Sequence, residues 1–430
     1  MKTSRRQFLK TSAAVSAALG SQLFPVPGFS RDRSPSDKLN IAHVGVGGMQ
    51  GAFHLGGTAS ENRIALCDVD SAILAKAAEN IPDAKRFGDW RKMLDTLGDQ
   101  IDAVVISTPD HTHAVTAMAA MKRSIHCYCE KPLAHDVWQI RQMQKLAADK
   151  KLKTQMGTQI HAGDNYRRVV EKIRSGAIGE VTEVHVKVGV VWGGQPATSD
   201  TVEVPENLNW DLWIGPAPMR AFQPCYLGGN WRSFWDFGNG GMGDMACHWI
   251  DLPFWALELD YPKTIEATSP HAPDADFAAR DLTVKYEFQR NGKTLPLYWY
   301  DGGADSPIFA EKGAPSGSVT LFIGTEGALW STYGEHGLLP SERFAEYQPP
   351  APTIAKSLGH HAEWIDAIKN DKETTCNFGY SGRLAETVLL GPAAYRCGKK
   401  LEYDANAMKA VNCPEADAIL KQPYRDGWTL

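Results

Sequence analysis

The chain has 430 residues, and its 45 Lys and Arg against 50 Asp and Glu give a formal net charge of −5 at pH 7. A mildly acidic chain lacks the positive surface that nucleic-acid binding requires, so nucleic acid is not an expected partner. Because single hydrophobic cores stop growing near about 250–300 residues, the length predicts two domains.

The first 37 residues are expected to form an export signal and a linker. Residues 4–10 carry a twin-arginine pattern, and residues 11–25 are weakly apolar. That stretch is too short and too rich in Ala and Ser to span a bilayer. A disordered basic tail is the alternative. The signal predicts a periplasmic protein that the twin-arginine machinery exports folded, with its cofactor bound and with no membrane attachment in the mature form.

The eight cysteines are interpreted as core residues, because the chain contains no Cys-x-x-Cys spacing. Cys127 and Cys129 share one face of a predicted strand and are not expected to bridge each other, whereas pairing among the others stays open. No metal site is predicted. The adjacent pair His360 and His361 is not interpreted as a site, because neighbouring side chains diverge on a helix.

From Lys38 onward, apolar strands alternate with helical segments. Strands are predicted at residues 39–44, 64–67, 103–106 and 124–129, and helices at residues 72–80, 90–97 and 114–121. This alternation predicts an α/β domain with a parallel sheet that helices cover on both faces.

A glycine turn, Gly45-Val46-Gly47-Gly48, follows the first strand. Such a turn allows close approach of a dinucleotide pyrophosphate, although Gln50 holds the third glycine position and Gly51 comes one residue later. Asp68 ends the second strand, where an acid binds both ribose hydroxyls of NAD and repels the 2′-phosphate of NADP. The alternative is that Asp68 caps the next helix, but Asp70 is the more natural cap. The turn and Asp68 together favour NAD.

Two polar clusters follow the next strands. Residues 107–113 are expected to line the nicotinamide ribose, with His111 the better candidate to face the ligand and His113 packing the following helix. Glu130-Lys131-Pro132 places Lys131 at the carboxyl end of the sheet, where open α/β folds bind ligands. A nicotinamide there would depress the pKa of the amine, so that Lys131 could take part in proton transfer. A solvated surface lysine is the alternative.

Together these motifs resemble the Gfo/Idh/MocA family, the nicotinamide sugar enzymes related to glucose–fructose oxidoreductase and inositol dehydrogenase. The similarity continues through residues 155–159, 240–248, 361–368 and 424–428, and the last two resemble an exported bacterial branch. It implies a Rossmann dinucleotide-binding domain at residues 38–158. It also implies a C-terminal α+β domain at residues 159–430, with a large, mostly antiparallel sheet that builds a homodimer or homotetramer. The C-terminal segment could pack back on the first domain.

In the second domain, strands are predicted near residues 181–191, 281–288 and 318–322, and residues 192–235 are loop-rich. Asp244 and His248 are four residues apart, so a helix puts them on one face. A helix-stabilising pair is the alternative, but the family's catalytic pair occupies this motif. The resemblance implies that His248 accepts a hydroxyl proton, that Lys131 stabilises the same oxygen, and that Asp244 orients the substrate.

Loop tryptophans are expected to stack on sugar faces, although some of them will be packing, and Arg232 is expected to bind hydroxyls. Tyr166 is either an acid or base or, alternatively, a helix-core tyrosine. The residues expected to bind substrate are His161, Tyr166, Trp213, Trp231, Arg232, Trp235, Asp244 and His248. The residues expected to bind the cofactor are Gly45, Gly47, Gly48, Met49, Gln50, Asp68, Ser107, Thr108, Pro109, His111, Glu130, Lys131 and Gln159.

The leading hypothesis is a periplasmic NAD-dependent oxidoreductase that oxidises a secondary hydroxyl of a glycoside, sugar or cyclic polyol. Because the periplasm offers no pool of free NAD, the cofactor must stay tightly bound. The alternative is a redox-neutral NAD-dependent glycosidase, in which transient oxidation of a ring hydroxyl permits elimination of the glycosidic bond. A sugar sensor without chemistry is a third class, which the intact Lys131, Asp244 and His248 argue against.

Overall fold

The structure is a computed structural model that describes residues 37–198 and 202–430. The predicted export signal therefore lies outside the described residues. The first sheet has six parallel strands in the order β3-β2-β1-β4-β5-β6. They are β1 (Asn40–Val44), β2 (Asn62–Cys67), β3 (Lys85–Phe87), β4 (Ala103–Ile106), β5 (His126–Cys129) and β6 (Thr154–Met156). The four predicted strands are confirmed to within two residues, whereas β3 and β6 escape prediction because three residues show no periodic pattern.

Helices connect the strands of this sheet, and three of them begin at an aspartate that accepts backbone hydrogen bonds. Asp70 caps α3, as predicted, while Asp89 caps α4 and Asp136 caps α6. The helices are α2 (Gly48–Gly57), α3 (Ser71–Glu79), α4 (Trp90–Leu97), α5 (Asp110–Lys122) and α6 (Val137–Asp149). Helix α5 begins four residues before the predicted start, so the whole segment from Asp110 is helical.

The strand order reverses between β1 and β4, and this is where doubly wound sheets bind ligands. Gly45 has φ +79° there, and an added Cβ would lie 2.7 Å from the carbonyl of Ser107. At Gly51 an added Cβ would lie 2.3 Å from the carbonyl carbon of Val46. Gly51 thus allows α2 to pack closely on the backbone of the glycine turn at Val46, and the chain has its third glycine at position 51 rather than 50.

The second sheet has nine strands in the order β13-β12-β11-β7-β10-β9-β8-β14-β15, and only the β7–β10 pair is parallel. The strands are β7 (Val181–Val188), β8 (Thr264–Thr268), β9 (Thr283–Arg290), β10 (Lys293–Asp301), β11 (Val319–Gly324), β12 (Ala328–Ser331), β13 (His336–Leu339), β14 (Leu401–Asp404) and β15 (Lys409–Ala410). The predicted mostly antiparallel sheet is confirmed.

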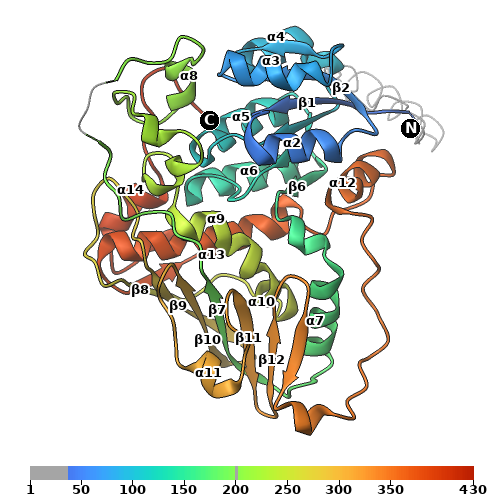
Figure 1. Cartoon of the computed structure of the whole chain (residues 1–430), viewed down its shortest axis with the longest axis vertical. Helices are drawn as coiled ribbons and strands as arrows, with labels where there is room; N and C mark the ends of the chain where they lie inside the picture. Colours follow the sequence, from blue (N-terminus) through green and yellow to red (C-terminus); the bar gives the residue numbers. More distant parts are fainter. Residues whose placement is uncertain (1–36, 199–201) are drawn as a thin grey trace, which may run out of the picture. The chain divides into compact units, whose positions relative to one another are not determined.

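The helices of the second part surround this sheet and reach the first one (Figure 1). They are α7 (Asp164–Arg174), α8 (Trp210–Ile214), α9 (Gly240–Trp249), α10 (Asp251–Ala256), α11 (Ile308–Lys312), α12 (His360–Lys369), α13 (Phe378–Cys397) and α14 (Asp417–Leu420). Helix α13 runs between the two sheets and packs against α6, α9 and β8. It is buried along most of its length because its sequence is apolar on nearly every face.

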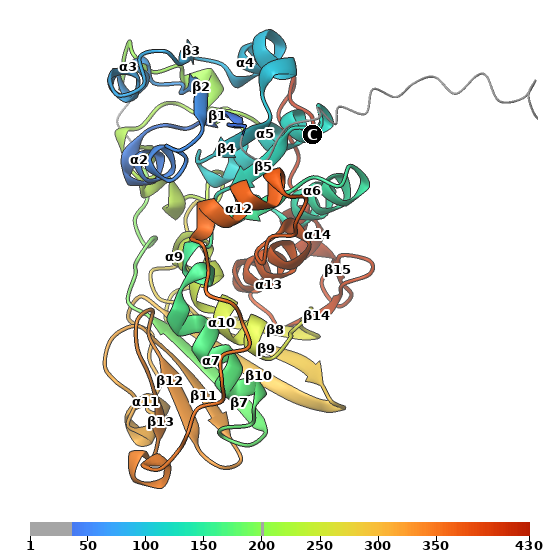
Figure 2. The same cartoon turned by 90° about the vertical axis from the view of Figure 1, so that its right-hand side faces the viewer.

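The last part of the chain returns to the first sheet. Helix α12 lies beside β5 (Figure 2), and its Trp364 packs in the cluster that contains Ile41 and Tyr128. Near the C-terminus, the guanidinium of Arg91 lies 5.0 Å from the ring centre of Trp428, and the Nζ of Lys122 donates to the carbonyl of Leu430 at 2.8 Å. Residues 38–430 consequently form one compact unit.

Two further observations concern the described residues. None of their helices is long and apolar enough to cross a membrane. All eight cysteines fall within them, and none of the eight is disulfide-bonded; six are buried and two are half-buried.

Replacing Gly51 by alanine is expected to destabilise the protein, because the new methyl group would collide with backbone rather than with a movable side chain. Overpacking of this kind costs about 1–3 kcal/mol. Gly56→Ala on the same helix is the matched control, since a Cβ there meets nothing within 4 Å and alanine favours a helix by about 1 kcal/mol. Urea unfolding measures both variants, and equal stabilities would contradict the packing role of Gly51.

Candidate functional site

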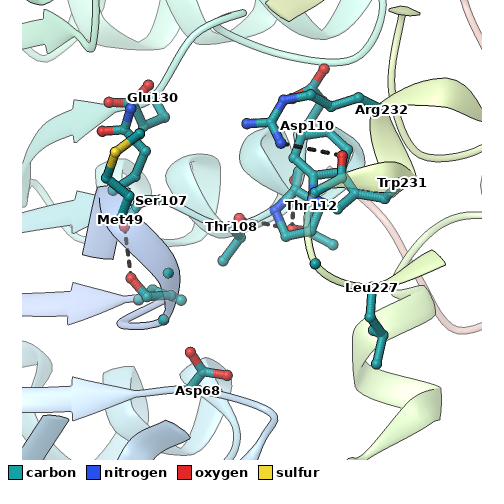
Figure 3. A pocket seen from close by; sticks show the side chains of 18 of the residues that line it. Met49, Asp68, Ser107, Thr108, Asp110, Thr112, Glu130, Leu227, Trp231 and Arg232 are labelled. Atoms are coloured by element: carbon teal, nitrogen blue, oxygen red, sulfur yellow. Dashed lines mark hydrogen bonds between the residues drawn. The ribbon is translucent and has the colours of Figure 1, made fainter. Parts of the chain in front are cut away.

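A cavity of about 950 Å³ opens at the carboxyl ends of β1, β2, β4 and β5. Its far wall comes from η4 (Asn230–Ser233) and α9 (Figure 3). This volume is at the upper end of the range for small-molecule and cofactor sites. The residues expected to bind the cofactor line it, with the exception of His111.

The glycine turn and the start of α2 form one end of the cavity. Helix α2 begins at Gly48, and the free backbone N–H groups of a helix N-terminus bind phosphate. Beside them, the carboxylate of Asp68 accepts from the backbone N–H of Val46 and of Asp70, each at 3.0 Å. Burial raises the pKa of Asp68, and these hydrogen bonds oppose the shift. The residues present therefore fit the pyrophosphate and ribose of a dinucleotide.

The segment after β4, residues 107–112, lines the cavity with hydroxyl groups. Ser107 donates to the carbonyl of Gly45 at 2.6 Å, and Thr112 donates to the hydroxyl of Thr108 at 2.8 Å. Pro109 lines the cavity between them.

His111 lies elsewhere. Its Nε2 donates to the carbonyl of Trp213 at 2.9 Å, its ring packs on Phe237, and it does not line the cavity. Because α5 begins at Asp110, Thr112 and Thr116 occupy the face that turns to the cavity, and His111 falls on the neighbouring face. Burial lowers the pKa of His111 to about 4.

Lys131 and Asp244 line the cavity and form an ion pair whose side chains are 5% and 11% exposed. The Nζ of Lys131 lies 2.6 Å from the carboxylate of Asp244 and 2.6 Å from its carbonyl oxygen. The same carboxylate accepts from the Nε of Arg232 at 2.8 Å and from the Nε1 of Trp192 at 2.7 Å. Burial alone would raise the pKa of Asp244, but Lys131 and Arg232 outweigh it and hold this pKa well below its usual range. Lys131 is 7% exposed, so it is not a solvated surface lysine.

His248 lies one helical turn after Asp244 and also lines the cavity. Burial, reinforced by the charge of Lys131, lowers the pKa of His248 to about 4. The imidazole is therefore neutral at neutral pH and able to accept a proton.

Glu130 is held by a buried chain of polar groups. Its carboxylate accepts from the Nε2 of His54 at 2.9 Å and from the amide of Gln159 at 2.6 Å. The Nδ1 of His54 lies 2.8 Å from the Nε2 of His361. Burial would raise the pKa of Glu130, but His54 and Lys131 lower it to about 2. The sequence did not predict a role for His361. In the structure it contacts His54, 307 residues away in the chain, and through His54 it helps to hold Glu130 in the cavity wall.

Three of the residues expected to bind substrate line the second-domain side of the cavity together with Asp244 and His248. They are Trp213, Trp231 and Arg232. The guanidinium of Arg232 lies 4.2 Å from the ring centre of Trp231, so the two present one stacked surface.

The other three residues expected to bind substrate do not line the cavity. His161 donates from Nδ1 to Asp251 at 2.9 Å. Tyr166 is buried and donates to the backbone carbonyl of His248 at 3.1 Å. Trp235 donates from Nε1 to the carbonyl of Asp274 at 3.0 Å. Each of these three hydrogen bonds is made inside the protein, and for Tyr166 this agrees with the helix-core alternative.

Sequence reasoning did not find Asp110, Trp192 or Tyr333, which also line the cavity. Trp192 lies in a loop after β7, and Tyr333 lies between β12 and β13, where its ring stacks on Trp249 at 4.3 Å. Neither position carries a local motif. Asp110 stands inside the cluster of residues 107–113, but the two histidines beside it were the more conspicuous candidates for a ligand-facing role.

This fold and site are those of a nicotinamide-dependent oxidoreductase family. Residues 39–158 match the family described as "Oxidoreductase family, NAD-binding Rossmann fold", and residues 172–430 match its "C-terminal alpha/beta domain". The chain belongs to the Gfo/Idh/MocA oxidoreductase family. Residues 2–20 match the twin-arginine translocation signal.

Among curated relatives, the chain is 32% identical over 211 residues to a glycosyl hydrolase family 109 protein of Stenotrophomonas maltophilia. It is 27% identical over 197 residues to the levoglucosan dehydrogenase of Pseudarthrobacter phenanthrenivorans. These matches cover 43% and 44% of this chain, and 41% of each relative, so they span about two-fifths of the relatives' length.

Among solved structures, the WlbA dehydrogenase of Bordetella pertussis, in complex with NADH and UDP-GlcNAcA, superposes with a TM-score of 0.62 at 17% identity. The superposition covers 85% of this chain and 99% of that one. At this identity, the likeness shows the two-sheet fold.

Asp244→Asn is expected to lower the free energy of unfolding by about 3–5 kcal/mol, because it removes the counter-ion of the buried Lys131 and the half-buried Arg232. Asp305→Asn is the matched control. Asp305 pairs with Lys187 at 3.0 Å on the surface, with its side chain 60% exposed, and such pairs contribute about 0–1 kcal/mol. Urea unfolding compares the two, and an equal loss in both variants would show that the buried pair has no special role.

Proposed function

We propose that the protein is an NAD-dependent oxidoreductase that oxidises a secondary hydroxyl of a glycoside, sugar or cyclic polyol. The observation that carries this proposal is the joining of Lys131, Asp244 and His248 in one cavity with the glycine turn and Asp68. The levoglucosan dehydrogenase and the NADH-bound dehydrogenase among the similar proteins support a carbohydrate substrate.

A bound nicotinamide would accept the hydride that leaves the carbinol carbon. His248, neutral because of its burial, would take the hydroxyl proton at a ring nitrogen. Lys131 would donate a hydrogen bond to the same oxygen and stabilise its developing negative charge. Asp244, whose carboxylate accepts from three donors, would hold Lys131 in place.

NAD is the proposed cofactor rather than NADP, because Asp68 lies after β2 beside the glycine turn, where an acid would disfavour a 2′-phosphate. We infer from the export signal that the mature protein works in the periplasm. Tight cofactor binding follows from that location, since no free pool could replace a lost dinucleotide. A homodimer or homotetramer through the nine-stranded sheet is proposed from the family resemblance.

A redox-neutral glycosidase is the second candidate, and the similarity to a glycosyl hydrolase family 109 protein favours it. In that reaction, oxidation of a ring hydroxyl acidifies the neighbouring C–H, the glycosidic group leaves by elimination, water adds, and the ketone is reduced back. The same three residues would serve the oxidation and the final reduction. Tyr166, buried against the carbonyl of His248, is not available as the acid or base of the elimination.

The deciding assay uses the purified mature protein without added NAD and a panel of nitrophenyl glycosides, levoglucosan and cyclic polyols. We expect reduced-nicotinamide absorbance to rise by about one equivalent per subunit, without release of nitrophenol, for an oxidoreductase that awaits its electron acceptor. Continuous nitrophenol release without lasting reduction of the cofactor would show that the protein is the redox-neutral glycosidase instead. If no compound gives cofactor reduction or nitrophenol release, the proposed carbohydrate activity is wrong.

Lys131→Met serves as the matched inactive variant in that assay. Loss of the stabilising amine should lower turnover by on the order of 10²–10³, while the copurified dinucleotide remains. Unchanged turnover in this variant would overturn the assignment of Lys131.

The single-turnover rate is expected to fall in acid only well below pH 6.5, which is the ordinary pKa of histidine. A histidine base works only when neutral, and burial lowers the pKa of His248 to about 4. The rate should therefore stay constant from neutral pH down to about pH 5 and fall as the pH passes through about 4. Stopped-flow measurement of cofactor reduction gives the profile, and a midpoint at pH 6.5 or above would rule out a buried neutral base.

A further inference from the structure

Five carboxyl groups line the cavity, and four of them are engaged by the protein. Asp68 and Asp70 accept backbone N–H groups, Glu130 accepts from His54 and Gln159, and Asp244 accepts from three side chains. Asp110 is the exception: its carboxyl group forms no hydrogen bond or ion pair with residues 37–198 or 202–430.

Asp110 is nevertheless enclosed. It is the first residue of α5 and is 3% exposed. Helix α9 passes close to it, since a Cβ at Gly243 would lie 3.8 Å from its Oδ2. Figure 3 shows Asp110 beside Arg232 and Trp231, on the opposite side of the cavity from Asp68 and Met49. Its carboxyl group therefore belongs to the substrate end of the cavity rather than to the dinucleotide end.

The nearby cations do not satisfy this carboxyl group. Lys131 and Arg232 both direct hydrogen bonds to Asp244, and Glu130 and Asp244 add negative charge to the surroundings of Asp110. The neighbouring thiols of Cys129 and Cys247 are buried, and their pKa values are raised, so they add no charge. Burial raises the pKa of Asp110 to about 8, against the opposing effect of Arg232 and Lys131.

We propose that Asp110 binds the substrate as a neutral carboxyl group that donates a hydrogen bond to a hydroxyl or ether oxygen of the carbohydrate. A neutral carboxyl group donates through its O–H and accepts through its C=O, and this matches a sugar oxygen next to the reacting carbon. A carboxylate would only accept. A buried group without a protein partner gains most from a ligand, because the described residues leave its hydrogen-bonding capacity unused. This inference rests on the proposed function for the identity of the ligand.

The protonation state is tested first, and this test needs no substrate. Infrared difference spectra of the holoprotein minus its Asp110→Asn variant are recorded from pH 5 to 10. We expect a protonated-carboxyl C=O band that is present at pH 7 and disappears with a midpoint near pH 8. The control Asp305→Asn, an exposed carboxylate, should give no such band at pH 7. Absence of the band from the Asp110 spectrum at pH 7 would overturn the proposal, whatever the activity of the protein.

The binding role is tested with the panel compound that reduces the bound cofactor or releases nitrophenol. In the unmodified protein, kcat/KM should decline above about pH 8, where Asp110 loses its proton. Asparagine keeps a neutral donor and acceptor, so Asp110→Asn should retain kcat/KM within a few-fold at pH 7 and show no such decline. Asp110→Leu should lose at least about tenfold in kcat/KM, mostly through KM, in keeping with one lost hydrogen bond. Melting temperatures and the copurified dinucleotide verify that both variants are folded. Equal loss in both variants, with the alkaline decline kept, would show that the carboxylate is the working form and would overturn the proposal.

Discussion

The buried carboxylate of Asp244 is the interaction on which the site depends. It stands on α9 of the second domain and receives Lys131 from the end of β5, Arg232 from η4 and Trp192 from the loop after β7. Only 5% of the Lys131 side chain and 21% of the Arg232 side chain are exposed, and cations withdrawn from water are costly without a counter-charge. The carboxylate therefore joins the two sheets at one point and fixes the position of the lysine that faces the cavity.

Around this anchor, the cavity combines fixed charges with groups kept neutral by burial. The charges of Lys131 and Asp244 are paired, while His248 has a lowered pKa and Asp110 a raised one. When the surroundings shift the pKa values of two groups in opposite directions, one group can accept a proton while the other donates a hydrogen bond at the same pH. Burial produces both shifts, because it disfavours the charged imidazolium of His248 and the charged carboxylate of Asp110.

Much of the first domain could be predicted from the sequence, because parallel strands buried on both faces leave continuous apolar runs. Lys131 and Asp68 were placed at the cavity by the same logic, since each ends such a run. His111 was not, because its orientation depends on where α5 begins. With the helix starting at Asp110, Thr112 and Thr116 face the cavity and His111 turns to Trp213. Trp235 and His161 likewise donate hydrogen bonds to residues inside the protein, and no local sequence pattern predicts these contacts.

The sequence alone determined what local spacing controls: the glycine turn, the strand ends, the helical pairing of Asp244 with His248 and the export signal. Tertiary structure decided what depends on residues distant in the chain. It brought His361 to His54 and Glu130, Trp192 to Asp244, and Asp110 to a place without a partner. The reason is physical: spacing along a helix or strand fixes which residues share a face, whereas burial, charge pairing and pKa depend on everything that packs against that face.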